Sequence, residues 1–159
     1  MIRFDEDSLK ETGFVGFVPV AELWDGALRM IPDVPGVYVV CRVSDGAPVF
    51  LETGSGGHFK GKAPNVAAAE LAANWVDGTP VVYIGKATSL RKRISQYVRF
   101  GQGKPVGHWG GRYIWQLADA PDLLFCWREV DGDPDAVETE LIRAFREVYG
   151  SRPFANLSK

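Results

Sequence analysis

The chain of 159 residues lacks any apolar run that approaches the roughly 20 residues needed to cross a bilayer. Its first residues, MIRFDEDSLKETG, are acidic, so they also lack the basic start and apolar centre of a secretory signal. We therefore expect a cytoplasmic protein that does not associate with membranes.

Cysteine is nearly absent, with Cys41 and Cys126 as the only two. Each lies inside an apolar run that is typical of a β-strand, in VYVVCRV and LLFCWREV. Because the two residues form no CxxC pair or other metal-binding spacing, we expect two free, buried thiols and no zinc site.

Acidic residues are missing from one long stretch, although the whole chain has a net charge of -2. No acid lies between Asp77 and Asp119, whereas the acids gather near the two ends of the chain. The cations of this stretch include Lys86, Arg91, Lys92, Arg93, Arg99, Lys104 and Arg112. The pattern predicts one basic surface on an acidic body, which suits a nucleic-acid partner. A solvated charged face without a partner is the alternative.

Length and composition indicate one soluble globular domain over residues 1–159, with 46% apolar and 24% charged residues. Residues 1–30 include a short amphipathic helix in PVAELWDGAL, and we expect them to cover the edge of the core.

Strand and helix patterns alternate along the remaining chain. The β-rich runs are 35–43, 47–53, 79–85 and 122–130, and Ser44-Asp45-Gly46 predicts a hairpin between the first two. Helical spacing is found at 65–75, 88–100 and 134–149, with capping signals at Thr88 or Ser89, Gly101, Asp133-Pro134 and Gly150. Together they predict an α+β fold with helices packed on a small, mostly antiparallel sheet.

The strand 79–85 ends in Tyr83-Ile84-Gly85 and leads directly into the basic helix. Backbone N–H groups at a helix start, together with cations, form a phosphate site. Arg93 and Tyr97 are four residues apart and share one face of this helix. On the last helix Glu138 projects on the shoulder of the apolar stripe. We therefore expect a carboxylate wedged among core side chains that needs a cation, either for structure or for function.

These residues resemble the motifs of the GIY-YIG nuclease family. Gly36-Val37-Tyr38 matches the first motif with valine for isoleucine, and Tyr83-Ile84-Gly85 matches the second without change. Arg93 follows ten residues after Tyr83, in a run especially similar to the nuclease domain of the excision-repair protein UvrC. Glu138 matches the metal-binding glutamate, and Asn156 in RPFAN matches the closing asparagine. The landmarks span residues 35 to 157.

The resemblance implies an endonuclease that hydrolyses DNA to 5'-phosphate and 3'-hydroxyl ends with Mg²⁺, or Mn²⁺ as the second choice of ion. Glu138 would hold the ion, and Tyr38 would act as general base. Because a phenol has a pKa of about 10, Tyr38 needs neighbouring cations that favour its phenolate. Lys86 and Arg93 would be those cations, and Arg93 would also bind the phosphate oxygens. Tyr83 would orient water or phosphate. Tyr97 lies where some relatives have a histidine, and Asn156 is the last implied catalytic residue.

The family often joins its two tyrosine motifs by a short hairpin, whereas 44 residues lie between Tyr38 and Tyr83 here. This spacing implies an insertion at about 53–78, which some standalone restriction endonucleases of the family also carry. Gly56 to Ala63 has P-loop spacing, but Ala63 offers no hydroxyl for Mg²⁺, so we expect no NTP binding. We predict a basic loop in which His58, Lys60 and Lys62 contact nucleic acid. A surface loop without a binding role is the alternative.

Residues 103–117 combine glycines, cations and aromatic residues, a mixture that can follow a nucleic-acid strand by stacking. Core aromatics beneath a glycine-rich loop explain it equally well, and His108 is not predicted to be catalytic. The predicted nucleic-acid contacts are Arg91, Lys92, Lys60, Lys62, Lys104 and Arg112.

Two other functions are compatible with the sequence. The first is a non-catalytic nucleic-acid-binding module on the same scaffold, which could dispense with Glu138 or Arg93. The second is an acidic interaction protein that retains only the fold. A homodimer is possible for a nuclease that cuts both strands, but the sequence carries no dimer signature.

Overall fold

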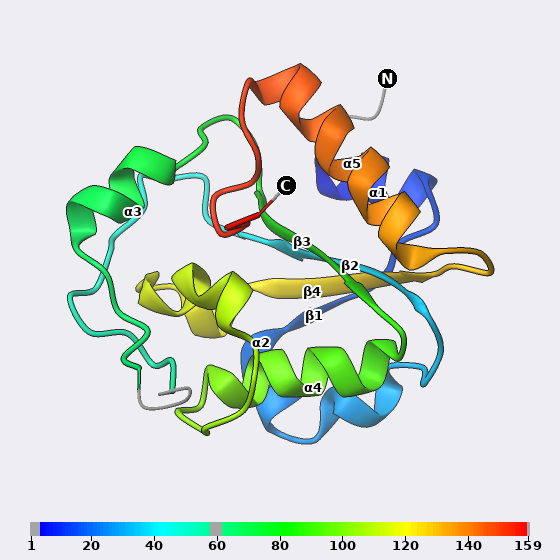
Figure 1. Ribbon diagram of the computed structural model, residues 1–159, viewed down its shortest axis with the longest axis horizontal. Helices are drawn as coiled ribbons and strands as arrows, with labels where there is room; N and C mark the ends of the chain where they lie inside the picture. The colour runs from blue at the N-terminus through cyan, green and yellow to red at the C-terminus, as the bar shows by residue number, and fades with distance from the viewer. Residues whose placement is uncertain (1–3, 58–61, 159) are drawn as a thin grey trace.

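The computed structural model describes residues 4–57 and 62–158. Its centre is a four-stranded antiparallel sheet in the order β1-β4-β2-β3, as Figure 1 shows. The strands are β1 (Val15–Pro19), β2 (Gly36–Cys41), β3 (Val81–Ala87) and β4 (Leu124–Glu129). The prediction of an α+β fold with a small antiparallel sheet flanked by helices is confirmed.

Helices cover both faces of the sheet (Figure 1). One face packs against α4 (Leu90–Phe100) and α2 (Val20–Trp24), and the other packs against α5 (Pro134–Tyr149) and α1 (Glu6–Glu11). The remaining helical segments are α3 (Ala68–Asn74) and the 3₁₀ turns η1 (Ala27–Met30), η2 (Trp109–Gln116) and η3 (Ala120–Asp122). In the described part of the chain, no helix has the length and apolar character needed to span a bilayer.

Strand β2 lies between two other strands and two layers of helices, so all six of its residues are buried. Its side chains alternate between the faces: Tyr38 and Val40 join the core beneath α4, and Val37 and Val39 join the core beneath α5. The alternation therefore sends Tyr38 toward the basic helix.

The predicted capping residues limit both long helices. The Ser89 hydroxyl accepts a hydrogen bond from the backbone N–H of Lys92 at the start of α4, at 3.2 Å. The Asp133 carboxylate accepts from the N–H of Asp135 at the start of α5, at 3.0 Å. Gly150 ends α5 with a φ of 80°. These signals are local, which explains why the sequence located the helices closely.

The predicted strand 47–53 is wrong. Strand β2 pairs with β3 on one side and with β4 on the other, so no edge of β2 is free for a hairpin partner. Phe50 forms only an isolated bridge with Leu117. The Arg42 side chain donates to the Gly46 carbonyl at 2.7 Å and to the Asp119 carboxylate at 2.8 Å, and these bonds fix the predicted turn near η2 and η3.

Strand β1 is not among the predicted strands, because its residues lie in the segment 1–30, for which the sequence predicts a short helix at the edge of the core. It pairs with β4 at the edge of the sheet, with a bulge between Gly16 and Val18. Phe17 within the bulge has a φ of 55°, and Gly16 has a φ of 99°. The bulge breaks the two-residue alternation by which a strand is recognised in a sequence.

Candidate active site

Antiparallel pairing of β2 with β3 brings the two tyrosine motifs together. Tyr38 lies opposite Gly85, and Tyr83 lies opposite Val40, so the two tyrosines are diagonal neighbours. Their ring centroids are 5.9 Å apart. The two motifs therefore pair although 44 residues lie between the two tyrosines.

Gly85 leaves the space that the Tyr38 ring occupies. A Cβ atom at position 85 would lie 2.5 Å from Cζ and 2.7 Å from the hydroxyl oxygen of Tyr38. Gly36 is enclosed in the same way, because a Cβ there would overlap the Arg128 carbonyl oxygen and lie 2.7 Å from Cδ1 of Leu90. Packing thus explains both motif glycines without any reference to catalysis.

Tyr38 is fully buried, and its hydroxyl lies 2.7 Å from Nε2 of His108. The His108 ring is also fully buried and stacks on Tyr97, with centroids 3.5 Å apart and planes 7° apart. Tyr97 donates its hydroxyl hydrogen to the Gly111 carbonyl at 2.6 Å. The three rings and Tyr83 form what we call the tyrosine-histidine cluster.

Burial sets the protonation states in this cluster. It is the largest influence on Tyr38 and raises the pKa of that phenol well above 10, while Arg93 lowers it by a smaller amount. Burial and the Glu138 charge raise the pKa of Tyr83 to about 12. Burial, with a smaller contribution from Arg93, holds the pKa of His108 well below 6.5. We therefore assign the Tyr38 hydroxyl as donor and neutral His108 as acceptor.

This electrostatic picture differs from the sequence analysis, which expected cations to favour the Tyr38 phenolate. Lys86 is exposed and forms an ion pair with Asp135. Arg93 acts in the expected direction, but the loss of water around the phenol outweighs it. As the structure stands, Tyr38 holds its proton.

The buried His108 predicts that the protein loses stability below pH 6.5. The unfolded chain gains a proton there that the folded chain excludes, so the free energy of unfolding falls as pH decreases. Between about pH 7.5 and 5.5 this one group lowers it by about 1.4 kcal/mol. Urea unfolding at several pH values measures the effect. His108→Gln should show a shallower fall than the wild type, and equal slopes in the two proteins would contradict the assignment.

Arg93 lines a pocket of about 400 Å³ between the first turns of α4 and α5. Both helices begin at the same end of the sheet (Figure 1). Its Nη1 donates to the Gly107 carbonyl at 2.8 Å and to Oε1 of Gln96 at 3.0 Å. Lys86 and Lys92 also line this pocket. Asp133 and Asp135 line it as well, and Asp135 pairs with Lys86. Lys92, Arg93 and the two helix starts are therefore the features that favour an anion such as phosphate.

Glu138 lies one turn beyond Asp135, which lines the same pocket. Its side chain is 7% exposed, and its charge raises the pKa of both Tyr38 and Tyr83. In residues 4–57 and 62–158 no three histidine, cysteine or acidic side chains gather as a metal-binding group. One buried carboxylate still fits Mg²⁺ or Mn²⁺, because such ions take most of their remaining ligands from water and phosphate.

Asn156 acts on the backbone of the second tyrosine motif. Its Oδ1 accepts from the Ile84 N–H at 3.0 Å, and its Nδ2 donates to the Ile84 carbonyl at 2.8 Å. Strand β3 is an edge strand, so Asn156 supplies the hydrogen bonds that a further strand would have made. It thereby fixes Tyr83 and Gly85 on either side of Ile84.

Replacing Asn156 by alanine should lower the free energy of unfolding by about 2 to 4 kcal/mol, because a buried N–H and carbonyl would lose their partners. Chemical unfolding measures this loss. Asn74→Ala is the matched control, since the Asn74 side chain makes one exposed hydrogen bond to Glu70 and should change stability by less than about 0.5 kcal/mol. Equal effects of the two substitutions would contradict a bracing role for Asn156.

The predicted nucleic-acid contacts are spread over several environments. Arg91 donates to the Ile31 carbonyl at 2.7 Å and so joins α4 to the segment after η1. The Arg112 guanidinium lies 4.4 Å from the centroid of the Trp109 ring. Lys62, Lys92 and Lys104 are exposed. His58 and Lys60 lie outside the described residues, as does part of the stretch with P-loop spacing, so the expected absence of NTP binding stays a prediction.

His108 is the residue of this site that the sequence analysis passed over. It lies 70 residues from Tyr38 in the chain and has no metal or catalytic motif around it. The glycines near His108, Gly107 and Gly110, are the one local feature that could have indicated a close approach of this segment to another part of the chain. Its contact with Tyr38 depends entirely on the tertiary fold.

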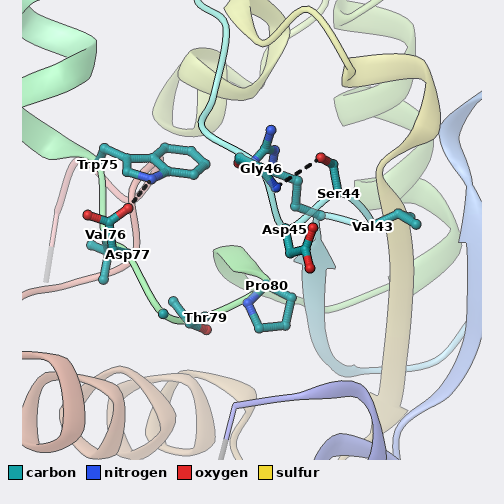
Figure 2. A pocket seen from close by; sticks show the side chains of 11 residues that line it. Val43, Ser44, Asp45, Gly46, Trp75, Val76, Asp77, Thr79 and Pro80 are labelled. Atoms are coloured by element: carbon teal, nitrogen blue, oxygen red, sulfur yellow. Dashed lines mark hydrogen bonds between the residues drawn. The ribbon is translucent and has the colours of Figure 1, made fainter.

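A second pocket, of about 360 Å³, lies at the opposite end of β2 and β3. Figure 2 shows Trp75 on one side of it and Asp45 on the other, with Thr79 and Pro80 below them. The Trp75 indole donates to the Asp77 carboxylate at 3.1 Å and packs against Phe154. None of the predicted catalytic residues lines this pocket.

Comparison with known proteins finds similarity over part of the chain. A segment of 69 residues is 33% identical to UvrABC system protein C of Nautilia profundicola. The match covers 43% of this chain and 11% of that protein, so it concerns a small part of a longer relative. No model of a protein family matches the chain, and no solved structure matches it.

Proposed function

We propose that the protein is a divalent-metal-dependent endonuclease that hydrolyses DNA to 5'-phosphate and 3'-hydroxyl ends. The observation that carries the proposal is that the pairing of β2 with β3 sets Tyr38 and Tyr83 side by side, with ring centroids 5.9 Å apart, while Arg93 lines a pocket at the end of β3. The similarity to UvrABC system protein C supports a nuclease-related role. Arg93 and Lys92 on the wall of the neighbouring pocket support a phosphate-containing substrate.

Each residue has a role that follows from its position. Arg93, at the pocket wall, would bind the non-bridging oxygens of the scissile phosphate, where negative charge grows in the transition state. Tyr83 would orient the phosphate or the attacking water. Asn156 would keep Tyr83 in register through its bonds to Ile84.

Glu138 would hold the metal ion, with water and phosphate as the remaining ligands. The bound ion would supply positive charge to the phosphoryl group and the leaving oxygen. Tyr38 would act as base only as the phenolate. Release of its hydroxyl from His108 and exposure to solvent would let its pKa fall back toward that of an ordinary phenol, its own proton would pass to bulk water, and the phenolate would then take the proton from the attacking water.

Supercoiled plasmid tests this proposal directly. The wild type should nick it with Mg²⁺ or Mn²⁺ and leave it intact in EDTA. Arg93→Gln should cut at least about a hundredfold more slowly, because one fixed donor to the transition state is lost. Arg99→Gln is the control, since Arg99 is an exposed cation on the same helix.

A non-catalytic nucleic-acid-binding module is the second candidate, because the same cationic pocket would bind phosphate without cutting. If DNA binding weakens steeply with salt and no cutting occurs in Mg²⁺ or Mn²⁺, the protein is this binding module and not an endonuclease. If neither binding nor cutting occurs on duplex, branched, single-stranded or RNA probes, both candidates fail.

A further inference from the structure

The segment from Gly101 to Gly111, which we call the cover, closes over the candidate active site. It connects α4 to η2 and contributes His108 to the tyrosine-histidine cluster. Tyr38 and His108 are fully buried, although the proposed chemistry requires that Tyr38 meet water and a phosphate. The described structure is therefore a closed state of the site.

Two neighbouring residues of the cover form hydrogen bonds with Arg93 and Tyr38, the two side chains that the proposed reaction needs. The Gly107 carbonyl accepts from the Arg93 guanidinium at 2.8 Å, where a phosphate oxygen would bind. His108 holds the Tyr38 hydroxyl at 2.7 Å, where the attacking water would bind. A carbonyl on the arginine and an imidazole on the phenol are thus direct competitors of the substrate.

The middle of the cover has few other polar anchors. Val106 N–H bonds to the Lys104 carbonyl and His108 N–H bonds to the Val106 carbonyl, so both of these bonds are local. Apart from the bond from Arg93 to Gly107, the hydrogen bonds that tie the cover to α4 are at its ends, from Gly103 and Lys104 to the last turn and from Tyr97 to Gly111. Within residues 105–108 as described, the hydrogen bonds to more distant parts of the chain are those with Arg93 and Tyr38.

Both ends of the cover contain glycine, which suits a hinge. Gly103 has a φ of 88°, a conformation that other residues rarely adopt. Gly110 and Gly111 lie at the other end, and residues 102–105 are exposed. Rotation at these two ends is the movement that would lift residues 105–108, and it would part the His108 ring from Tyr97 and Val106 from the core.

We propose that the cover is an autoinhibitory lid, latched by Tyr38 and Arg93, that DNA displaces by competing for these two residues. The inference rests on the proposed function for the identity of the competitor. The latch itself consists of contacts within the free protein. Opening would free the Arg93 guanidinium for phosphate and return Tyr38 to water in a single movement.

The latch predicts an unusual effect of Tyr38→Phe. The substitution keeps the buried ring but removes the hydroxyl, so His108 loses its partner and the closed state is weakened. Since a typical hydrogen bond changes an equilibrium about fivefold, the open fraction should rise about fivefold. Apparent DNA affinity scales with that fraction, so Tyr38→Phe should bind a duplex about fivefold more tightly in EDTA.

Hydrogen exchange in the free protein tests the latch without DNA. In Tyr38→Phe the amides of residues 103–110 should exchange about fivefold faster than in the wild type, with the rest of the sheet unchanged. Tyr149→Phe is the matched control, because Tyr149 is a partly buried tyrosine at the end of α5. Unchanged exchange of the cover in Tyr38→Phe would overturn the lid.

The second experiment measures hydrogen exchange with duplex DNA bound in EDTA. Binding to the wild type should accelerate exchange across residues 103–110, since phosphate replaces the Gly107 carbonyl on Arg93. If DNA binds but the cover stays protected, the lid is overturned while the nucleic-acid function stands. If DNA does not bind, the proposed function fails, and the comparison of free Tyr38→Phe with the wild type still decides whether the latch exists.

Discussion

Glu138→Gln is expected to slow metal-dependent cutting by at least about a hundredfold while leaving DNA binding in EDTA unchanged. Glutamine keeps the size of the buried side chain but loses the charge that would hold the ion. Because a bound metal ion contributes several kcal/mol to phosphoryl transfer, its loss should remove nearly all cutting. Plasmid nicking measures the rate, and a gel shift measures the binding.

The matched control is Glu140→Gln, on the same helix. Glu140 is exposed and pairs with Arg143 at 2.7 Å, so its loss should change cutting by less than about threefold. A second readout is independent of catalysis. Because the Glu138 charge raises the pKa of Tyr83, Glu138→Gln should lower that pKa from about 12 in a spectrophotometric titration. Cutting at the wild-type rate by Glu138→Gln would refute the assignment of Glu138 as metal ligand.

Gly85→Ala is expected to lower the free energy of unfolding by about 2 to 3 kcal/mol and to abolish cutting. The new methyl group would overlap the Tyr38 ring, which lies 2.5 Å from the position of the added carbon. Tyr38 has no room to retreat, because it is fully buried and its ring stacks against Phe125. Either Tyr38 or strand β3 must shift, and both belong to the candidate site.

Gly132→Ala is the control for this substitution. Gly132 has no neighbouring atom within 4 Å of an added Cβ, so alanine should change stability by less than about 0.5 kcal/mol there. Urea unfolding and plasmid nicking measure the two effects. If Gly85→Ala unfolds at the wild-type urea concentration, the glycine does not serve to accommodate Tyr38.

Several parts of the structure could be predicted from the sequence because their signals are local. Ser89 and Asp133 cap α4 and α5 as expected, since a side chain three or fewer residues away satisfies the free N–H groups of the first turn. Glu138 is buried as its place on the helix indicated, because helical spacing decides which side chains face the core.

Strands were harder to predict, because an alternating run says that a segment is extended but does not name its partner. Residues 47–53 have such a run, yet both edges of β2 are taken by β3 and β4. Strand β1 was missed for the opposite reason, since its bulge at Gly16 hides the alternation. Which strands meet depends on contacts between distant segments.

The sequence by itself determined the residues of the candidate site: two tyrosine motifs, Arg93 on a basic helix and Glu138 on an amphipathic one. Short motifs that resemble those of a known nuclease family pointed to these residues, and helical spacing placed Arg93 and Glu138 beside the buried stripes of their helices. Only the tertiary structure decided that Tyr38 is buried, that His108 binds it from 70 residues away, and that Asn156 braces β3. These contacts join segments whose separation leaves no periodic trace in the sequence, so packing alone specifies them.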